Sequence, residues 1–99
     1  TAGGKNVAPQ PIENVLKTNP YITDVLVIGD KRKFLSALIV PNFEKLEEYA
    51  KFNKIPYESM QDLVKKQDIV KFLEAEIDRA TPQFASYEKI KKIAIFYFH

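Results

Sequence analysis

The first thirteen residues hold the positions that could reach into a binding site. Gly3 and Gly4 lack a Cβ, so the backbone there can take positive φ angles and approach another molecule closely. Lys5 places a cation directly after this bend, and Pro9 and Pro11 stiffen the chain that follows. Proline also suits the first turn of a helix, where its missing N–H costs nothing. The order of bend, charge, stiff connector and helix predicts a loop that reaches into a site, and a frayed chain end is the alternative interpretation.

A second cationic cluster lies between two apolar runs, at the expected tip of a β-hairpin. It consists of Lys31, Arg32 and Lys33. One interpretation is contact with a phosphate group carried by RNA, CoA or a lipid headgroup. The other is a charged turn that keeps the hairpin soluble and discourages pairing at the sheet edge, and the sequence favours this second interpretation.

Several kinds of catalytic centre are excluded by composition. The chain has no cysteine, which rules out a disulfide framework and a thiolate metal site. His99 is the single histidine, so the chain cannot supply a histidine-based triad or a His-rich metal site, and we expect no metal ligands. Glu44, Glu47 and Glu48 share a helix side with interleaved lysines, which is typical of a solvated helix face.

The length and composition are those of one soluble globular domain. The 99 residues are 45% hydrophobic and 28% charged, so one modest core is possible but a deep catalytic cavity is not. The formal net charge of +2 is too small to argue for nucleic acid as a partner. We find no signal peptide and no apolar run long enough to cross a bilayer.

Hydrophobic periodicity and breaker residues predict the elements that position these groups. In chain order we expect a helix over Pro11–Thr18, a strand over Asp24–Ile28, a turn over Gly29–Lys33, a strand over Phe34–Val40, a helix over Phe43–Phe52 capped by Asn42, a short helix capped by Ser59, a longer helix from Asp68 to Ala80, and a strand over Lys89–Phe98. The predicted class is α+β: a small three-stranded sheet, made of one antiparallel hairpin and the final strand, flanked by about four helices. A partial ribbon is expected at residues 1–7, with its partner upstream of Thr1.

Two strands have patterns with particular consequences. The run Asp24–Ile28 is almost continuously apolar, which favours a strand covered on both faces of the sheet. In the final strand, simple alternation places Ile90 with Lys92 on one face and Lys91 with Ile93 on the other. Neither face of that strand is then purely apolar, so we expect it at the edge of the sheet.

Three stretches resemble the C-terminal domain of AMP-forming long-chain fatty acid–CoA ligases, in the adenylate-forming acyl-CoA synthetase superfamily. Residues 3–13 resemble the loop and first helix of that domain, residues 27–41 resemble its hairpin, and residues 87–92 resemble the segment that enters its last strand. The stretches occur in the same order and span almost the whole chain.

The resemblance implies what the complete enzyme would do. Members activate a fatty acid with ATP and Mg²⁺ to an acyl-adenylate and then transfer the acyl group to CoA. Residues 1–99 would form the mobile C-terminal domain, truncated at both ends, and an N-terminal AMP-binding domain of the same chain would be its partner. Gly3, Gly4, Lys5 and Asn6 would form the loop that swings in beside the pantetheine path during acyl transfer.

Two functional parts of that family are expected outside these residues. The hinge would precede Thr1, and the lysine that assists adenylation would follow His99, so no catalytic residue is assigned here. We therefore expect the 99-residue chain to fold without catalysing the reaction, and to bind no cofactor by itself. The resemblance implies a cytoplasmic enzyme and allows peripheral association of the full-length protein with a membrane.

Two other functional classes remain open on the sequence. One is a small nucleic-acid-binding α+β module that uses residues 31–33 and nearby aromatic side chains. The other is a protein-interaction module that uses an exposed sheet edge. The ligase interpretation itself predicts no nucleic-acid partner.

Overall fold

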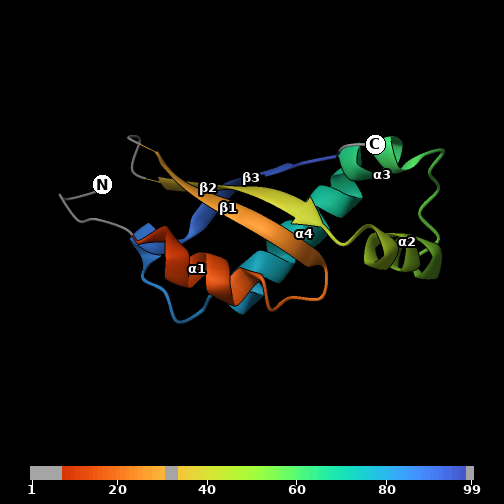
Figure 1. Cartoon of the computed structure of the whole chain (residues 1–99). Coiled ribbons are helices and arrows are strands. Elements are labelled where there is room, and N and C mark those ends of the chain that lie inside the picture. Colours follow the sequence, from red (N-terminus) through yellow and green to blue (C-terminus); the bar gives the residue numbers. More distant parts are fainter. Residues whose placement is uncertain (1–7, 31–33, 98–99) are drawn as a thin grey trace.

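A computed structural model describes residues 8–30 and 34–97 (Figure 1). Its elements are α1 (Pro9–Leu16), β1 (Ile22–Asp30), β2 (Phe34–Pro41), α2 (Phe43–Phe52), α3 (Met60–Lys65), α4 (Gln67–Ala80), the short 3₁₀-helix η2 (Ser86–Glu88) and β3 (Ile90–Ile95). The predicted α+β class, with three strands and four α-helices in the described residues, is confirmed. The predicted N-terminal ribbon lies outside the described residues.

The sheet is mixed, and its strand order is β1-β2-β3. β1 and β2 form the predicted antiparallel hairpin, whereas β3 pairs with β2 in parallel after the chain has passed through α2, α3 and α4. β2 is therefore the central strand, and β3 lies at an edge, as the sequence predicts.

A bulge in β3 resolves the conflict that simple alternation predicts for this strand. The register with β2 shifts after Ile90, so Lys91 is an extra residue in β3. Ile90 and Ile93 consequently both pack against the main core. Lys92 and Ala94 lie on the opposite face of the sheet, where they line the same hollow.

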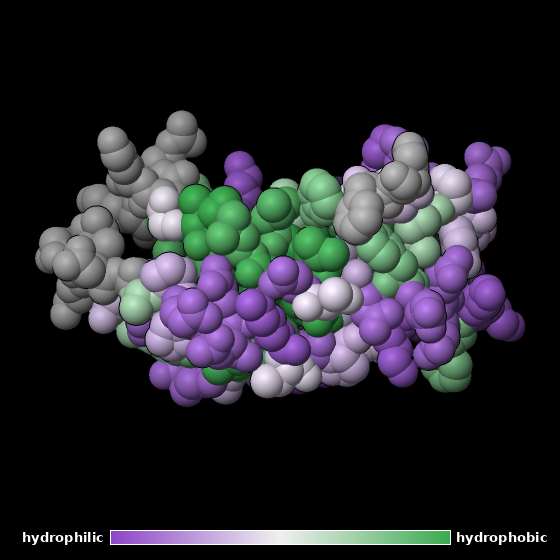
Figure 2. Space-filling model, in the orientation of Figure 1, coloured by the Kyte–Doolittle hydropathy of each residue, from purple (hydrophilic) through white to green (hydrophobic). Residues whose placement is uncertain are grey.

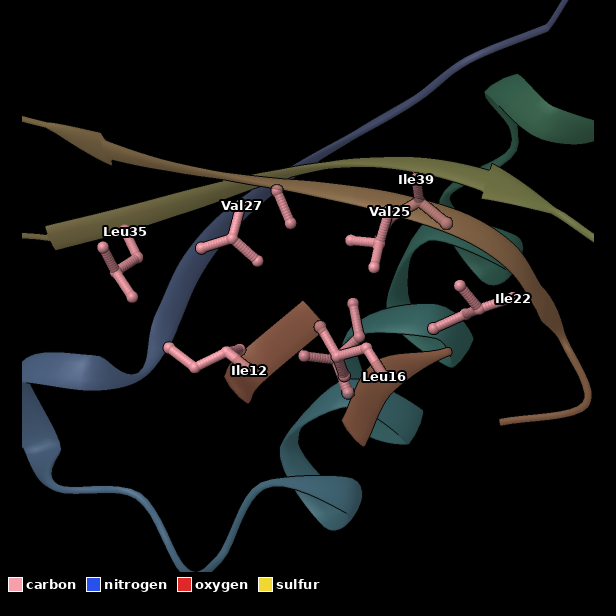
Figure 3. Close-up of a cluster of buried hydrophobic side chains, with 9 residues drawn as sticks. Ile12, Leu16, Ile22, Val25, Val27, Leu35 and Ile39 are labelled. Carbon is pink, nitrogen blue, oxygen red and sulfur yellow. The ribbon is translucent and has the colours of Figure 1, made fainter. Parts of the chain in front are cut away.

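The main core lies between α1, α4 and one face of the sheet (Figure 3). Ile12 and Leu16 of α1 are completely buried, and their side chains point toward Val25, Val27 and the strand behind them. Burying a side chain of this size contributes about 1.5–3 kcal/mol to stability. The i, i+4 spacing of the two α1 residues places both on the face that meets the sheet.

A second core lies between α2, α3 and α4, at the other end of the elongated molecule. Its buried members are Leu46, Ala50, Leu63, Val64, Ile69 and Leu73. The ring of Phe72 stacks on Tyr49 and meets Tyr21 edge to face. Ile93 packs against both cores, so β3 connects the two ends of the molecule.

Two helix caps that the sequence predicts are present. The Asn42 side chain accepts a hydrogen bond from the Lys45 N–H at 3.2 Å, and the Ser59 hydroxyl accepts one from the Asp62 N–H at 3.1 Å. The Asp62 carboxylate in turn accepts from the Glu58 N–H at 3.0 Å. These side chains satisfy N–H groups that have no partner inside the first turn of a helix.

Several predicted boundaries are wrong. α1 ends at Leu16 and not at Thr18, β1 begins at Ile22 and not at Asp24, and β3 ends at Ile95 and not at Phe98. α4 begins at Gln67, and Asp68 lies inside its first turn, because the chain enters this helix from α3 through the extended residue Lys66. α1 begins at Pro9, so both prolines fit in its first turn. β1 continues through Gly29, where a Cβ would make only an ordinary 4.0 Å contact, so this glycine does not force a turn.

The prediction that β1 is covered on both faces is also wrong for the described residues. Val25 and Val27 are buried, but Leu26 and Ile28 are 53% and 46% exposed. α1 and α4 lie on the same side of the sheet (Figure 1). The apolar run of β1 therefore has side chains on both faces of the sheet, and the described helices cover only the face that carries Val25 and Val27.

Candidate functional site

The predicted site residues fall in two segments that the structure does not describe. Gly3, Gly4, Lys5 and Asn6 precede the described residues, and Lys31, Arg32 and Lys33 lie in the gap between β1 and β2. What the structure gives is the position of the elements that carry these segments.

α1 anchors the N-terminal segment firmly to the sheet. Ala8 is the N-cap and makes no side-chain capping bond, and Pro9 follows at once as the first helical residue. Because Ile12 is completely buried one turn later, residues 1–7 lead directly into a fixed helix.

Glu13 adds a polar contact that the sequence analysis did not identify. Its carboxylate Oε2 accepts a hydrogen bond from the Val27 N–H at 2.8 Å. β1 is an edge strand, so this N–H faces away from β2 and would otherwise be an unpaired donor. The contact joins residues 14 positions apart, and no local pattern predicts it.

The three stretches that carry the family resemblance start from one end of the sheet. The hairpin closes with the pair Asp30–Phe34, and the neighbouring residue Leu35 pairs with Ile90 at the start of β3. Figure 3 shows Ile12, near the start of α1, at this same end, close to Leu35 and Val27. The fold therefore brings the attachment points of both predicted site segments together, although they are far apart in the sequence.

Lys89 stabilises the end of a helix. Its ammonium group donates a hydrogen bond to the Thr81 carbonyl, and Thr81 is the C-cap residue of α4. A cation at a helix C-terminus is favoured because the partial negative charges of the last carbonyls gather there. Lys91 and Lys92, which follow in β3, are exposed to solvent.

Asp24 has a shifted pKa. The hydrogen bond from the Val25 N–H, at 2.9 Å, lowers the pKa of Asp24 below its ordinary value of 3.8, and the Lys17 ammonium at 3.4 Å lowers it further. This group is therefore ionised at neutral pH, which does not suit it to act as a general acid.

The glutamates of α2 behave as a solvated face, as predicted. Glu48 is exposed and lies 3.7 Å from the Lys45 ammonium, while Glu47 accepts a 3.3 Å hydrogen bond from the Tyr57 hydroxyl. Within residues 8–30 and 34–97, no group of three or more Asp, Glu or His side chains could hold a metal ion. No helix in the same ranges is long and apolar enough to span a membrane.

Sequence comparison identifies relatives of this chain. The family described as "AMP-binding enzyme C-terminal domain" matches residues 1–99. Long-chain-fatty-acid–CoA ligase FadD15 of Mycobacterium tuberculosis is 35% identical over 96 residues, which is 96% of this chain and 16% of FadD15. Long-chain-fatty-acid–CoA ligase ACSBG1 of Homo sapiens is 55% identical over 40 residues, which is 39% of this chain and 6% of that protein.

Solved structures share the fold. The A-PCP didomain of carboxylic acid reductase from Segniliparus rugosus, in complex with AMP, aligns with a TM-score of 0.66 at 21% identity, over 96% of this chain and 12% of that chain. The adenylation domain of a carboxylate reductase from Mycobacterium chelonae aligns with a TM-score of 0.56 at 24% identity, over 94% and 13% of the two chains. In the sequence comparison, this chain spans about one-sixth of the length of FadD15. From the match over residues 1–99, the chain belongs to the family of C-terminal domains of AMP-binding enzymes.

Proposed function

We propose that this chain is the C-terminal domain of an AMP-forming long-chain fatty acid–CoA ligase. The complete enzyme would activate a fatty acid with ATP to an acyl-adenylate and then transfer the acyl group to CoA. The observation that carries the proposal is the 35% identity to FadD15 over almost the whole chain. The described parts of the family-like stretches adjoin at one end of the sheet, where Leu35 pairs with Ile90, and this supports a common functional end.

In this proposal the domain acts by delivering a loop to a neighbouring domain. Gly3 and Gly4 allow the backbone to approach the pantetheine arm of CoA closely, and Lys5 and Asn6 supply polar contacts beside it. The described anchors, Ile12 and the Glu13–Val27 hydrogen bond, would hold the base of this loop in place while the domain moves. Positioning of this kind accelerates a reaction by fixing the reactants in one geometry.

The remaining chemistry is assigned to the rest of the polypeptide. An N-terminal AMP-binding domain would hold ATP, Mg²⁺ and the fatty acid, and a lysine beyond His99 would assist adenylation. Lys31–Lys33 are a candidate contact for a phosphate of CoA. We place the enzyme in the cytoplasm, with peripheral membrane association of the full-length protein as a further part of the proposal.

The test separates the two half-reactions in the complete polypeptide that carries this chain. The enzyme should produce acyl-CoA, AMP and pyrophosphate from palmitate, ATP and CoA. Replacement Gly4→Val adds a branched side chain where close approach is proposed, so acyl transfer to CoA should fall about tenfold or more. Palmitate-dependent ATP–pyrophosphate exchange, which reports adenylation, should change by less than about twofold.

Gly29→Val is the matched control, because Gly29 is exposed in β1 and a Cβ there meets only ordinary contacts. It should leave both half-reactions close to the wild-type rates. Equal losses of exchange and transfer in Gly4→Val would contradict the proposed loop role. Exchange activity in the isolated 99-residue chain would contradict the proposal that it is inactive alone.

A further inference from the structure

The two edges of the sheet differ in how their backbone groups are satisfied. On the β1 edge, the outward N–H groups of Val25 and Val27 donate to the carboxylates of Asp24 and Glu13. α1 packs along this strand, and in Figure 2 hydrophilic residues gather over α1, below the sheet. β3 forms the other edge. Because an edge strand with free N–H and C=O groups pairs readily with another strand, the partners of β3 decide whether the sheet can be extended.

The β3 edge presents backbone groups that no described residue satisfies. The Phe96 N–H donates to the Ile39 carbonyl at 2.7 Å, which identifies the side of β3 that faces β2. Alternate residues of an edge strand direct their N–H and C=O groups away from the neighbouring strand, so Ile93 and Ile95 direct theirs outward. Within residues 8–30 and 34–97, the structure gives no acceptor for the N–H of either residue. In this part of the chain, β3 therefore lacks the carboxylate contacts that protect β1.

Two hollows follow this edge, between β3 and the helices α3 and α4. One, of about 290 Å³, has Val64, Val70 and Ile95 among its lining residues, and the other, of about 270 Å³, has Ile77. Ile93 lines both hollows, so they succeed one another along the strand. When a peptide adds to a sheet edge, main-chain hydrogen bonds hold it and pockets beside the edge take its alternate side chains. The β3 edge offers both features.

The charges beside the two hollows are mainly positive. Lys65 lines the first hollow, and Lys91 and Lys92 line the second, where Glu74 is the acidic side chain among the described lining residues. The three lysines are exposed, so their charges face solvent and any partner. Like charges brought together oppose association, whereas opposite charges favour it. The lysines therefore discourage pairing with a basic strand, and the same charges attract an acidic one.

We infer that the β3 edge binds an acidic peptide segment, which adds to the sheet as a further strand. The backbone of this segment pairs with Ile93 and Ile95, and its apolar side chains enter the two hollows. Acidic side chains alternate with the apolar ones and lie near Lys65 at one end and near Lys91 and Lys92 at the other. The inference does not depend on the proposed function, because it concerns an edge to which no step of the ligase reaction is assigned.

Peptide binding to the complete polypeptide that carries this chain tests the inference. The probe is a fluorescein-labelled peptide of about seven residues, long enough to span β3, in which valine and glutamate alternate. One control has lysine in place of glutamate, and a second is the acidic peptide with every backbone nitrogen methylated. Fluorescence anisotropy should show saturable binding of the acidic peptide. Both controls should bind about tenfold more weakly or less, because one reverses the charge and the other removes the backbone donors.

A proline substitution tests the backbone contact from the side of the protein. Ile95→Pro removes an N–H that faces away from β2, so the pairing of β3 with β2 is kept. Ile95→Ala is the matched control, since it also shortens the side chain but retains the N–H. The acidic peptide should bind Ile95→Pro about fivefold more weakly than Ile95→Ala, because one hydrogen bond to the peptide is lost. Equal affinities of the two variants would overturn the inference.

A second set of variants changes only exposed side chains, so folding is retained. The double variant Lys91→Glu and Lys92→Glu places negative charge beside the second hollow and should weaken binding of the acidic peptide about tenfold. Lys71→Glu is the control, because Lys71 is exposed on α4 and lines neither hollow. It makes the same change of charge and should leave the affinity within about twofold of wild type. Equal losses in the double variant and in Lys71→Glu would show a general charge effect and contradict a site at β3.

Hydrogen exchange locates the bound peptide. Residues 90–97 should exchange more slowly when the acidic peptide is present, whereas residues 22–30 of β1 should be unchanged, because their outward N–H groups already have partners. Protection of β1 instead of β3, or no binding of the acidic peptide, would overturn the inference. A dimer of the polypeptide that Ile95→Pro dissociates would identify a second copy as the occupant and would also overturn it. No readout uses ligase activity, so a failure of the proposed function leaves this test intact.

Discussion

Carboxylates satisfy the free edge of the sheet at two places on β1. Asp24 accepts from the Val25 N–H, and Glu13 accepts from the Val27 N–H. Because an edge strand with free donors is a template for pairing with another chain, these contacts protect the hairpin from edge-to-edge association. The role of Asp24 follows from a neighbouring residue, whereas that of Glu13 depends on the packing of α1.

Asp24 makes stability depend on pH in the acid range. Its pKa is lower in the folded chain than its ordinary value of 3.8, so the unfolded state binds more protons between the two pKa values. The stabilising contribution is therefore complete above the ordinary pKa and is lost as the pH falls through the folded one. Thermal unfolding should show Asp24→Asn with a lower Tm than wild type near pH 6, and the difference should vanish toward pH 2.

The largest single cause of this shift is the backbone hydrogen bond from Val25, and Lys17 adds a side-chain hydrogen bond and Coulomb attraction. The variant Lys17→Met should therefore keep part of the acid-dependent change in Tm. If Lys17→Met removed that change completely, the ion pair rather than the backbone contact would be responsible.

Helix starts show which elements a local pattern can predict. Asn42 and Ser59 were predicted as caps and act as caps, because a cap needs only its own helix. Asp68 is a residue type that often caps helices, but it lies inside the first turn of α4. The N-cap of α4 is Lys66, because the path of the chain from α3 fixes where α4 begins.

This difference predicts unequal costs for two similar substitutions. Ser59→Ala removes an N-cap hydrogen bond and should lower the free energy of unfolding by about 1 kcal/mol. Asp68→Ala removes only a charge near the helix start and should cost less than about 0.5 kcal/mol. Urea denaturation followed by circular dichroism measures both, and a larger loss for Asp68→Ala would show that it caps α4 after all.

Bulges and long-range contacts limited the rest of the prediction. The alternation of β3 predicted two mixed faces, and the inserted residue Lys91 instead gives one packed face and one open face. The apolar pattern of β1 predicted a strand covered on both faces, and this was wrong for the described residues, because helices cover only one of them. The site residues predicted at the N-terminus and at residues 31–33 stay predictions, since they lie outside the described residues, and the structure gives only the position of the described elements that precede or follow them.

The whole molecule has two cores along one axis, and Ile93 packs against both. Folding as a single cooperative unit requires contacts that join such cores, because each is too small to be stable alone. β3 is therefore as important for coupling the ends of the domain as for completing the sheet.

Ile93→Ala should weaken this coupling. The free energy of unfolding should fall by about 1–2 kcal/mol, since the side chain is partly buried. Native-state hydrogen exchange should then give different opening free energies for amides of α1 and α3, which should agree in the wild type. Val15→Ala is the control, because Val15 is half-buried on α1 and belongs to neither core. It should lower stability while the opening free energies of α1 and α3 stay equal. Equal opening free energies in Ile93→Ala would exclude the coupling role.

The parallel pairing of the central strand has a consequence for biosynthesis. β2 is translated directly after β1, but its second neighbour is made only after three further helices have been translated. During that interval the nascent hairpin exposes a long unsatisfied edge, and late closure of this kind slows folding and invites misassembly. We therefore expect that a translational pause or a chaperone acting while α2, α3 and α4 are made changes the yield of native protein. The same pause or chaperone acting before β2 is made should have a smaller effect.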